Sequence, residues 1–144
     1  MHKKLKMKGL AVVLVGGVLI YAMPYIKMEF AGSATYTEQN AREYLFYTPE
    51  ILKKMPRISG RYEFDFANIT GPAKHVHVVK FYGTSDVSKI DLYLESIGYK
   101  KQKECDIDAS CWRGSDPQET VYVGMLNGEK MVLVQVVTDF SNTQ

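Results

Sequence analysis

The sequence lacks the residue patterns on which most catalytic and nucleotide-binding sites depend. Its one Gly-Gly pair lies inside an apolar run and its other glycines are isolated, so it has no glycine-rich loop to hold a phosphate. No serine, histidine and acid indicate a nucleophilic set, and no pair of carboxylates stands out for acid–base chemistry. We therefore expect neither enzymatic activity nor a cofactor.

The chain also has little excess charge of either sign, with 18 basic and 16 acidic residues. Residues 1–30 hold five of the basic residues and one of the acids, which leaves 13 basic and 15 acidic residues in the remainder. A nucleic-acid-binding domain needs a basic face. Because the part of the chain after residue 30 is close to neutral, nucleic acid is not expected as a partner.

Cysteine is scarce, and Cys105 and Cys111 are the only two. Two cysteines this close in a polar stretch are typical of a disulfide formed in an oxidising compartment. Closing so short a loop contributes about 2 kcal/mol in the chain-entropy model. The alternative is a pair of free thiols in a reducing compartment. Redox catalysis and a zinc site are not expected, because the spacing is not C-x-x-C and two thiolates alone do not hold zinc.

One long apolar run is present, at residues 9–26, and it contains no charged residue. A helix of this length spans roughly 27 Å, close to the hydrocarbon thickness of about 30 Å. Four lysines precede the run and only Lys27 follows it closely, so the positive-inside rule places residues 1–8 in the cytoplasm and the rest of the chain outside. Residues 9–26 would contact membrane lipid. Gly16 and Gly17 offer a close-approach face for another helix.

The alternative to an anchor is a cleaved signal peptide, with its cleavage site among the small residues 31–34. The apolar core of a signal peptide usually runs about 7–15 residues, which is shorter than this one. Lys27 and Glu29 also separate the core from the candidate site. An uncleaved anchor is therefore favoured, and the signal peptide stays open as the second interpretation.

The remainder divides into a helical neck at residues 31–60 and an α+β domain at residues 61–140. Residues 31–36 are small and polar and are expected to lead away from the membrane. In the neck, Thr48-Pro49-Glu50 is a helix start signal, and Pro56 stops the helix. The neck has few basic residues, so packing on the domain is favoured over lying on lipid.

The domain shows five strand patterns and one clear helix. Alternating or β-rich segments predict strands at 61–66, 74–82, 99–105, 119–126 and 129–139, the last two joined by an Asn127-Gly128 hairpin. Apolar residues spaced by three or four predict a helix over 87–97 that ends at Gly98. This order predicts a mostly antiparallel sheet with one covering helix, in the split arrangement of the ferredoxin-like class.

Histidine is scarce as well, with three in the chain. His75 and His77 stand two residues apart on a predicted strand, so both side chains point to the same face and provide two possible metal ligands. A metal site needs a third and a fourth ligand, which Glu63, Asp65 or Glu104 would supply if their strands are neighbours. The favoured alternative is two half-exposed polar residues on a sheet face.

Aromatic residues, in contrast, are abundant: ten Tyr, six Phe and one Trp. They exceed what a small core can bury, and exposed Tyr and Trp are favoured at protein interfaces. Trp112 and Arg113, next to the second cysteine, are the predicted contact point. The alternative is that Trp112 folds back over the sheet as a lid on the core.

These features predict a bacterial inner-membrane protein with a cytoplasmic N-terminus and a small periplasmic domain. Its predicted role is that of a non-enzymatic accessory or assembly protein that binds another envelope protein. Three alternatives stay open. The first is a membrane-tethered inhibitor or immunity protein against a periplasmic toxin or hydrolase. The second is a metal-binding envelope module that uses His75 and His77, and the third is a small subunit of a larger membrane complex, packed through Gly16 and Gly17.

Overall fold

The computed structural model describes residues 2–126 and 128–141, with side chains from residue 6 onward. The chain forms two compact units, Met1–Ala31 and Gly32–Gln144. The first unit is helix α1 (His2–Glu29), which includes the whole apolar run. Within it, Lys6–Glu29 is long and apolar enough to cross a membrane, with a mean hydropathy of 2.1. The predicted apolar helix is therefore confirmed, and both the anchor and the signal-peptide interpretations require it.

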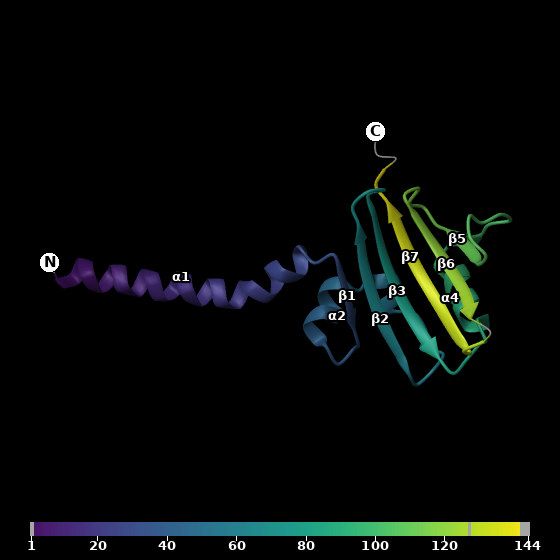
Figure 1. Cartoon of the computed structure of the whole chain (residues 1–144), viewed down its shortest axis with the longest axis horizontal. Helices are drawn as coiled ribbons and strands as arrows, with labels where there is room; N and C mark the ends of the chain where they lie inside the picture. The colour runs from purple at the N-terminus through teal and green to yellow at the C-terminus, as the bar shows by residue number, and fades with distance from the viewer. Residues whose placement is uncertain (1, 127, 142–144) are drawn as a thin grey trace. The chain divides into compact units, whose positions relative to one another are not determined.

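The second unit is built on one antiparallel sheet of seven strands (Figure 1). The strands are β1 (Ser33–Tyr36), β2 (Tyr62–Ile69), β3 (Lys74–Tyr82), β4 (Lys100–Lys101), β5 (Ser110–Arg113), β6 (Glu119–Leu126) and β7 (Met131–Asp139). Their spatial order is β1-β2-β3-β7-β6-β5-β4, and every neighbouring pair is antiparallel.

The order of the strands follows from the long connection that joins β3 to β4. Helix α4 (Ser88–Ser96) lies between β3 and β4 in the chain, and the four strands after it return one by one until β7 pairs with β3. The sheet thus consists of two meanders joined by a helix. The α+β class and the antiparallel sheet are confirmed, whereas the ferredoxin-like arrangement is not confirmed.

Three helices lie on one face of this sheet, which we call the covered face (Figure 1). They are α2 (Ala41–Tyr47), α3 (Glu50–Lys53) and α4, and they bury Tyr47, Leu52, Ile90 and Leu94. The buried sheet residues on the covered face are Tyr36, Phe64, Phe66, Val79, Phe81, Trp112, Val121, Val123, Val132, Val134 and Val136. The alternating pattern of each strand predicts this face correctly, because successive side chains point to opposite sides of a sheet.

The neck packs on the domain, as its composition predicts. The ring of Tyr47 stacks on Phe66 at 4.8 Å between centroids, and the ring of Tyr44 meets Phe64 edge-on at 5.3 Å. Arg57 holds this region together. Its guanidinium pairs with Glu38 at 2.8 Å and donates hydrogen bonds to the Leu52 carbonyl and the Tyr44 hydroxyl.

Three segments differ from the sequence prediction. Of the strand predicted at residues 99–105, only Lys100–Lys101 form a strand, β4, and the other two differences are short strands that are not predicted from the sequence. Residues 33–36, predicted as an exit linker, form the edge strand β1, whose register pairs Tyr36 with Phe64. Residues 110–113, predicted as part of the disulfide loop, form β5 and put Trp112 into the core at 1% exposure. Both strands have four residues, so no alternating pattern is long enough to identify them, and pairing with a neighbour decides their conformation.

The helix and hairpin predictions hold with small shifts. Asp86 accepts hydrogen bonds from the backbone and the hydroxyl of Ser88 at the start of α4, and Gly98 adopts a left-handed φ of +93° after its end. Ile97, predicted on the buried stripe, is 44% exposed because the helix ends at Ser96. Strands β6 and β7 form the predicted hairpin, but its first turn residue, Asn127, lies outside the described residues.

Candidate functional site

The sheet face opposite α2, α3 and α4, which we call the open face, carries none of these three helices (Figure 1). The register places Val76, Val78, Leu133 and Val137 side by side on β3 and β7, with their side chains partly exposed. Tyr122 and Gly124 of β6 continue this face toward β5.

The β1–β3 side of the open face is occupied by charges that already neutralise one another. The ammonium of Lys80 lies 2.5 Å from a carboxylate oxygen of Asp65 and 3.7 Å from one of Glu63. The hydroxyl of Thr35 donates to Asp65 at 2.7 Å, and the hydroxyl of Tyr82 donates to Glu63. The hydrogen bond to Asp65 raises the pKa of Lys80. This network joins three strands and leaves no strong charge unpaired among the residues described on that side.

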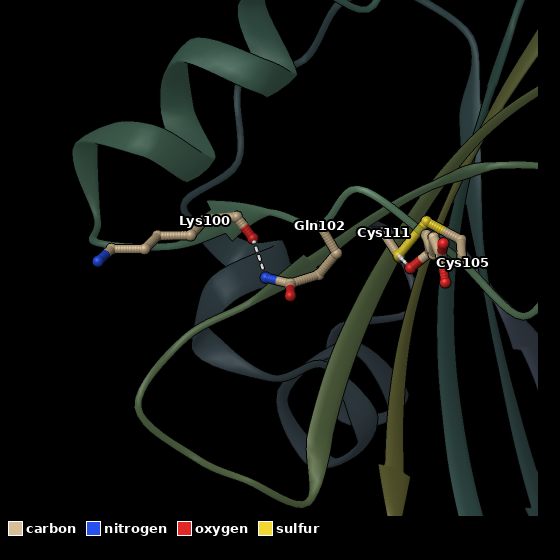
Figure 2. Close-up of a disulfide and its surroundings, with 5 residues drawn as sticks. Lys100, Gln102, Cys105 and Cys111 are labelled. Atoms are coloured by element: carbon tan, nitrogen blue, oxygen red, sulfur yellow. Dashed lines mark hydrogen bonds between the residues drawn. A yellow bond between two sulfur atoms is a disulfide. The ribbon is translucent and has the colours of Figure 1, made fainter.

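The β5–β6 side of the open face is bordered by a short loop between two cysteines. We call residues 105–111, closed by the Cys105–Cys111 disulfide, the disulfide loop. Cys111 lies opposite Tyr122 in the ladder, so its side chain is on the open face. The two sulfurs are 2.08 Å apart, and the bond ties the start of the loop to β5 (Figure 2). The predicted disulfide is thus present in the structure.

The disulfide loop and the sheet together enclose a cavity of about 130 Å³, which we call the loop hollow. Its lining consists of Ile107, Asp108, Ala109, Tyr122, Gly124, Met125, Leu126, Leu133 and Gln135. Gly124 leaves room for it, because a Cβ at this position would meet only the Cβ of Ala109, at 3.7 Å. Its largest apolar members are exposed: Ile107 at 48%, Met125 at 49% and Leu126 at 44%.

The charge around the loop hollow is acidic. Asp108 lines it, and no lysine or arginine is among its lining residues in the described part of the chain. Burial raises the pKa of the Tyr122 hydroxyl, and the nearby carboxylate of Asp106 raises it further. On its other side the disulfide loop borders a second, more polar cavity of about 430 Å³, lined in part by Lys101 and Lys103. Asp108 lines both cavities, and among the described residues only the second cavity also has lysines in its lining.

Hydrogen bonds to backbone carbonyls hold the segment that leads into the disulfide loop. The side-chain amide of Gln102 donates to the carbonyl of Lys100 at 2.8 Å (Figure 2). The backbone N–H of Gln102 donates to the carbonyl of Cys111 at 2.8 Å. These bonds and the disulfide fix both ends of the loop, so the wall of the loop hollow is set by covalent and hydrogen-bonded contacts rather than by a core of its own.

The structure places His75 and His77 on the same face, as their spacing requires, and that face is the covered one. The ring centroid of Phe66 lies 5.8 Å from His75 and 5.2 Å from His77, and Phe140 lies 4.9 Å from His75. Glu63 and Asp65 face the opposite side of the sheet. In the part of the chain that the structure describes, no three His, Cys, Asp or Glu side chains are grouped to hold a metal ion. The metal site stays a prediction without a third ligand.

His77 is the most perturbed histidine. Burial and, to a smaller extent, neighbouring His75 lower its pKa to about 4, against a hydrogen bond to the backbone of Tyr47 that raises the pKa. Its Nδ1 is buried without a hydrogen-bond partner among the described residues. A neutral histidine packed on Phe66 is therefore a core residue whose protonation would disturb the packing.

The predicted contact residues separate in the structure. Trp112 lies in the core with 1% of its surface exposed, so a partner cannot reach the indole. This position agrees with the alternative in which Trp112 folds back over the sheet. Arg113 beside it is exposed and stays a candidate contact. Gly16 and Gly17 lie in α1, where a Cβ added at either position would meet no neighbouring group within 4 Å. The close-approach face for another helix therefore stays a prediction.

The sequence patterns do not single out the residues of the loop hollow, although two signals point to it. Gly124 interrupts an otherwise β-branched and aromatic strand, which is typical of a site where another group approaches closely. Ile107 is the one large apolar residue between the two cysteines. Comparisons with protein-family models, with curated proteins and with solved structures return no match for this chain.

Proposed function

We propose that this protein is a single-pass membrane protein whose domain of residues 32–144 is a non-enzymatic accessory or assembly module that binds another envelope protein. The observation that carries the proposal is the asymmetry of the sheet. Its covered face forms a complete core with three helices, while its open face keeps partly exposed Val76, Val78 and Leu133 and the loop hollow beside them. Apolar side chains left outside a complete core are favoured where a partner covers them.

The proposed location is the bacterial inner membrane, with the N-terminus in the cytoplasm and the domain in the periplasm. The four lysines before the apolar run support this orientation, because basic residues are retained on the cytoplasmic side. The Cys105–Cys111 bond supports it independently, because disulfides persist in oxidising compartments. Both arguments put the same part of the chain outside the cytoplasm.

The test is extraction of the tagged full-length protein from its native membranes in mild detergent, followed by mass spectrometry of the proteins that co-purify at fixed ratio. We expect a membrane-embedded or envelope partner at a constant ratio to the bait. The control bait is residues 1–31 fused to an unrelated soluble domain, which keeps the apolar helix and removes the sheet. Recovery of the same partner with this control would assign binding to α1 and contradict the proposed role of the domain.

The inhibitor or immunity interpretation gives a different result in the same experiment. It predicts a one-to-one complex with a soluble toxin or hydrolase and no stable membrane partner. A membrane partner at fixed ratio would exclude it as the main function. A soluble effector whose activity falls when the domain is added would replace the accessory role.

A further inference from the structure

The loop hollow collects exposed apolar side chains that the core does not use. Ile107 is 48% exposed and Leu126 is 44% exposed, and both line this one cavity, whereas Met125 borders it from β6 with its side chain on the covered face, opposite Val132. They come from two elements, the disulfide loop and the end of β6, which the disulfide holds near each other. A fixed apolar cavity on a surface is the usual receptor for a single bulky side chain of a partner.

The strand that forms the floor of the loop hollow also has a free edge. The β5–β6 ladder ends at the Ser110–Val123 pair, whereas β6 continues for three more residues, Gly124–Leu126, which pair with β7 on their other side. Ala109 lies beside Gly124 on the β5 side, since its Cβ is 3.7 Å from the position of a Cβ on Gly124, so among the described residues the β5-side edge is free at Met125 and Leu126. Unpaired N–H and C=O groups at a sheet edge are a template for an added strand.

The charges near the loop hollow indicate which kind of partner would bind there. Asp108 lines the loop hollow, and Glu104 is exposed just before Cys105. Asp106 and Arg113 both lie near enough to affect Tyr122, and the effect of the Asp106 carboxylate is the larger of the two. A second copy of this chain that docked symmetrically through the same surface would bring these carboxylates against their own copies, which is unfavourable. A segment that carries a basic residue beside its apolar anchor would instead pair with them.

From these three observations we propose, on the basis of the proposed function, that the loop hollow is the docking site for an extended segment of the partner protein. The segment lies along the free edge at Met125 and Leu126, beyond Ala109, and places one bulky apolar side chain in the loop hollow. A lysine or arginine next to that side chain faces Asp106 and Asp108. The disulfide acts as a positioning device, since it holds the wall that Ile107 provides.

A substitution that fills the cavity tests the site. Gly124 does not adopt a left-handed φ and has only the Cβ of Ala109 within 4 Å, so Gly124→Val is compatible with the strand and projects into the loop hollow. A second variant, Met125→Lys, places a charge at the free edge, where lysine discourages strand addition. The matched control is Leu92→Ser on α4, which removes an apolar side chain that is 64% exposed elsewhere on the domain. Unchanged fluorescence of buried Trp112 shows that a variant is folded.

The experiment compares wild-type protein, the two site variants and the control in the native-membrane extraction. We expect Gly124→Val and Met125→Lys to reduce partner recovery at least tenfold, while Leu92→Ser leaves it unchanged. If the partner is recovered equally with all four proteins, the loop hollow is not the docking site, although the proposed function stands. If no partner is recovered with wild-type protein, both are wrong. If both site variants fail to fold, a photo-crosslinking amino acid at exposed Leu126 replaces them, with the same amino acid at Leu92 as its control.

The chemistry of the occupant is tested separately by that crosslink. We expect the residue at position 126 to crosslink to one segment of the partner, with alternating residues, a bulky apolar side chain and an adjacent Lys or Arg. A crosslink to an acidic segment or to a helix would overturn the proposed occupant. A crosslink between two copies of this chain would overturn it in favour of self-association.

Discussion

Acidification is expected to destabilise the domain through His77, whose buried ring packs on Phe66. Its pKa in the folded state is about 4, and an unfolded histidine has a pKa of about 6.5. The unfolded chain therefore takes up the proton first as the pH falls. The contribution of neutral His77 to stability is complete above pH 6.5 and is lost progressively between pH 6.5 and pH 4.

The size of the effect follows from this difference. Each unit of pH in that range costs about 1.4 kcal/mol, so a change from pH 7 to pH 5 would cost about 2 kcal/mol if the full shift applied. The ring keeps part of its surface in contact with solvent. We therefore expect a loss of about 1 to 2 kcal/mol, which is a substantial part of the stability of a small domain.

The assay is urea unfolding of the full-length protein in detergent micelles at pH 7 and pH 5, followed by fluorescence. Trp112 is the only tryptophan and is 1% exposed, so its emission reports unfolding of the sheet directly. His77→Gln removes the titrating ring and should lose less stability over the same interval. Burial raises the pKa of Asp91, so acidification favours the folded state through this group. The contribution is the same in both proteins and cancels from the comparison.

Two results would refute this reasoning. The first is an equal loss of stability between pH 7 and pH 5 in wild-type protein and His77→Gln. The second is that His75→Gln abolishes the pH dependence, because burial, and not the neighbouring histidine, is the main cause of the lowered pKa. Retention of most of the effect in His75→Gln is the expected control.

Three further predictions concern stability and use the same unfolding assay. Arg57→Ala should cost about 2 to 4 kcal/mol, since it leaves partly buried Glu38 without its partner and removes the hydrogen bond to the Leu52 carbonyl. Its control, Lys54→Ala at the exposed position after α3, should cost less than about 0.5 kcal/mol. Equal costs would show that the contacts of Arg57 do not stabilise the neck. Gly98→Val should cost about 1 to 3 kcal/mol, because a β-branched residue strains at a φ of +93°, and a neutral result would contradict the left-handed helix end. Replacing both Cys105 and Cys111 with serine should cost about 2 kcal/mol relative to oxidised wild-type protein, and reduction of the wild-type protein should cost the same. No loss of stability in the double variant relative to oxidised wild-type protein would show that the loop is ordered without the bond.

Much of the sheet can be predicted from the sequence because its long strands alternate. Strands β3 and β6 have the predicted bounds, and β7 buries alternate residues, Val132, Val134 and Val136, together with Met131 on its other face. The start and end of α4 are also predictable, since Asp86 and Gly98 have local roles that need no distant partner. Local signals of this kind act through adjacent backbone groups alone.

The site cannot be predicted in the same way, because its members meet only through the sheet register. Trp112 follows a polar loop, as a surface residue would, but its pairing with Lys101 and Val121 turns the indole into the core. Ile107 and Leu126 are far apart in the sequence and share the loop hollow only because β5 pairs with β6. Strand order is a property of the whole chain, and no short pattern specifies it.

The most direct test of the central claim is the native mass of the full-length protein after extraction from its own membranes. The chain alone has a mass of 16.4 kDa. The proposed accessory role predicts a complex whose mass exceeds this value by that of one envelope partner in a fixed ratio. A species at 16.4 kDa, or at a whole multiple of it, would contradict the claim that the domain serves another envelope protein.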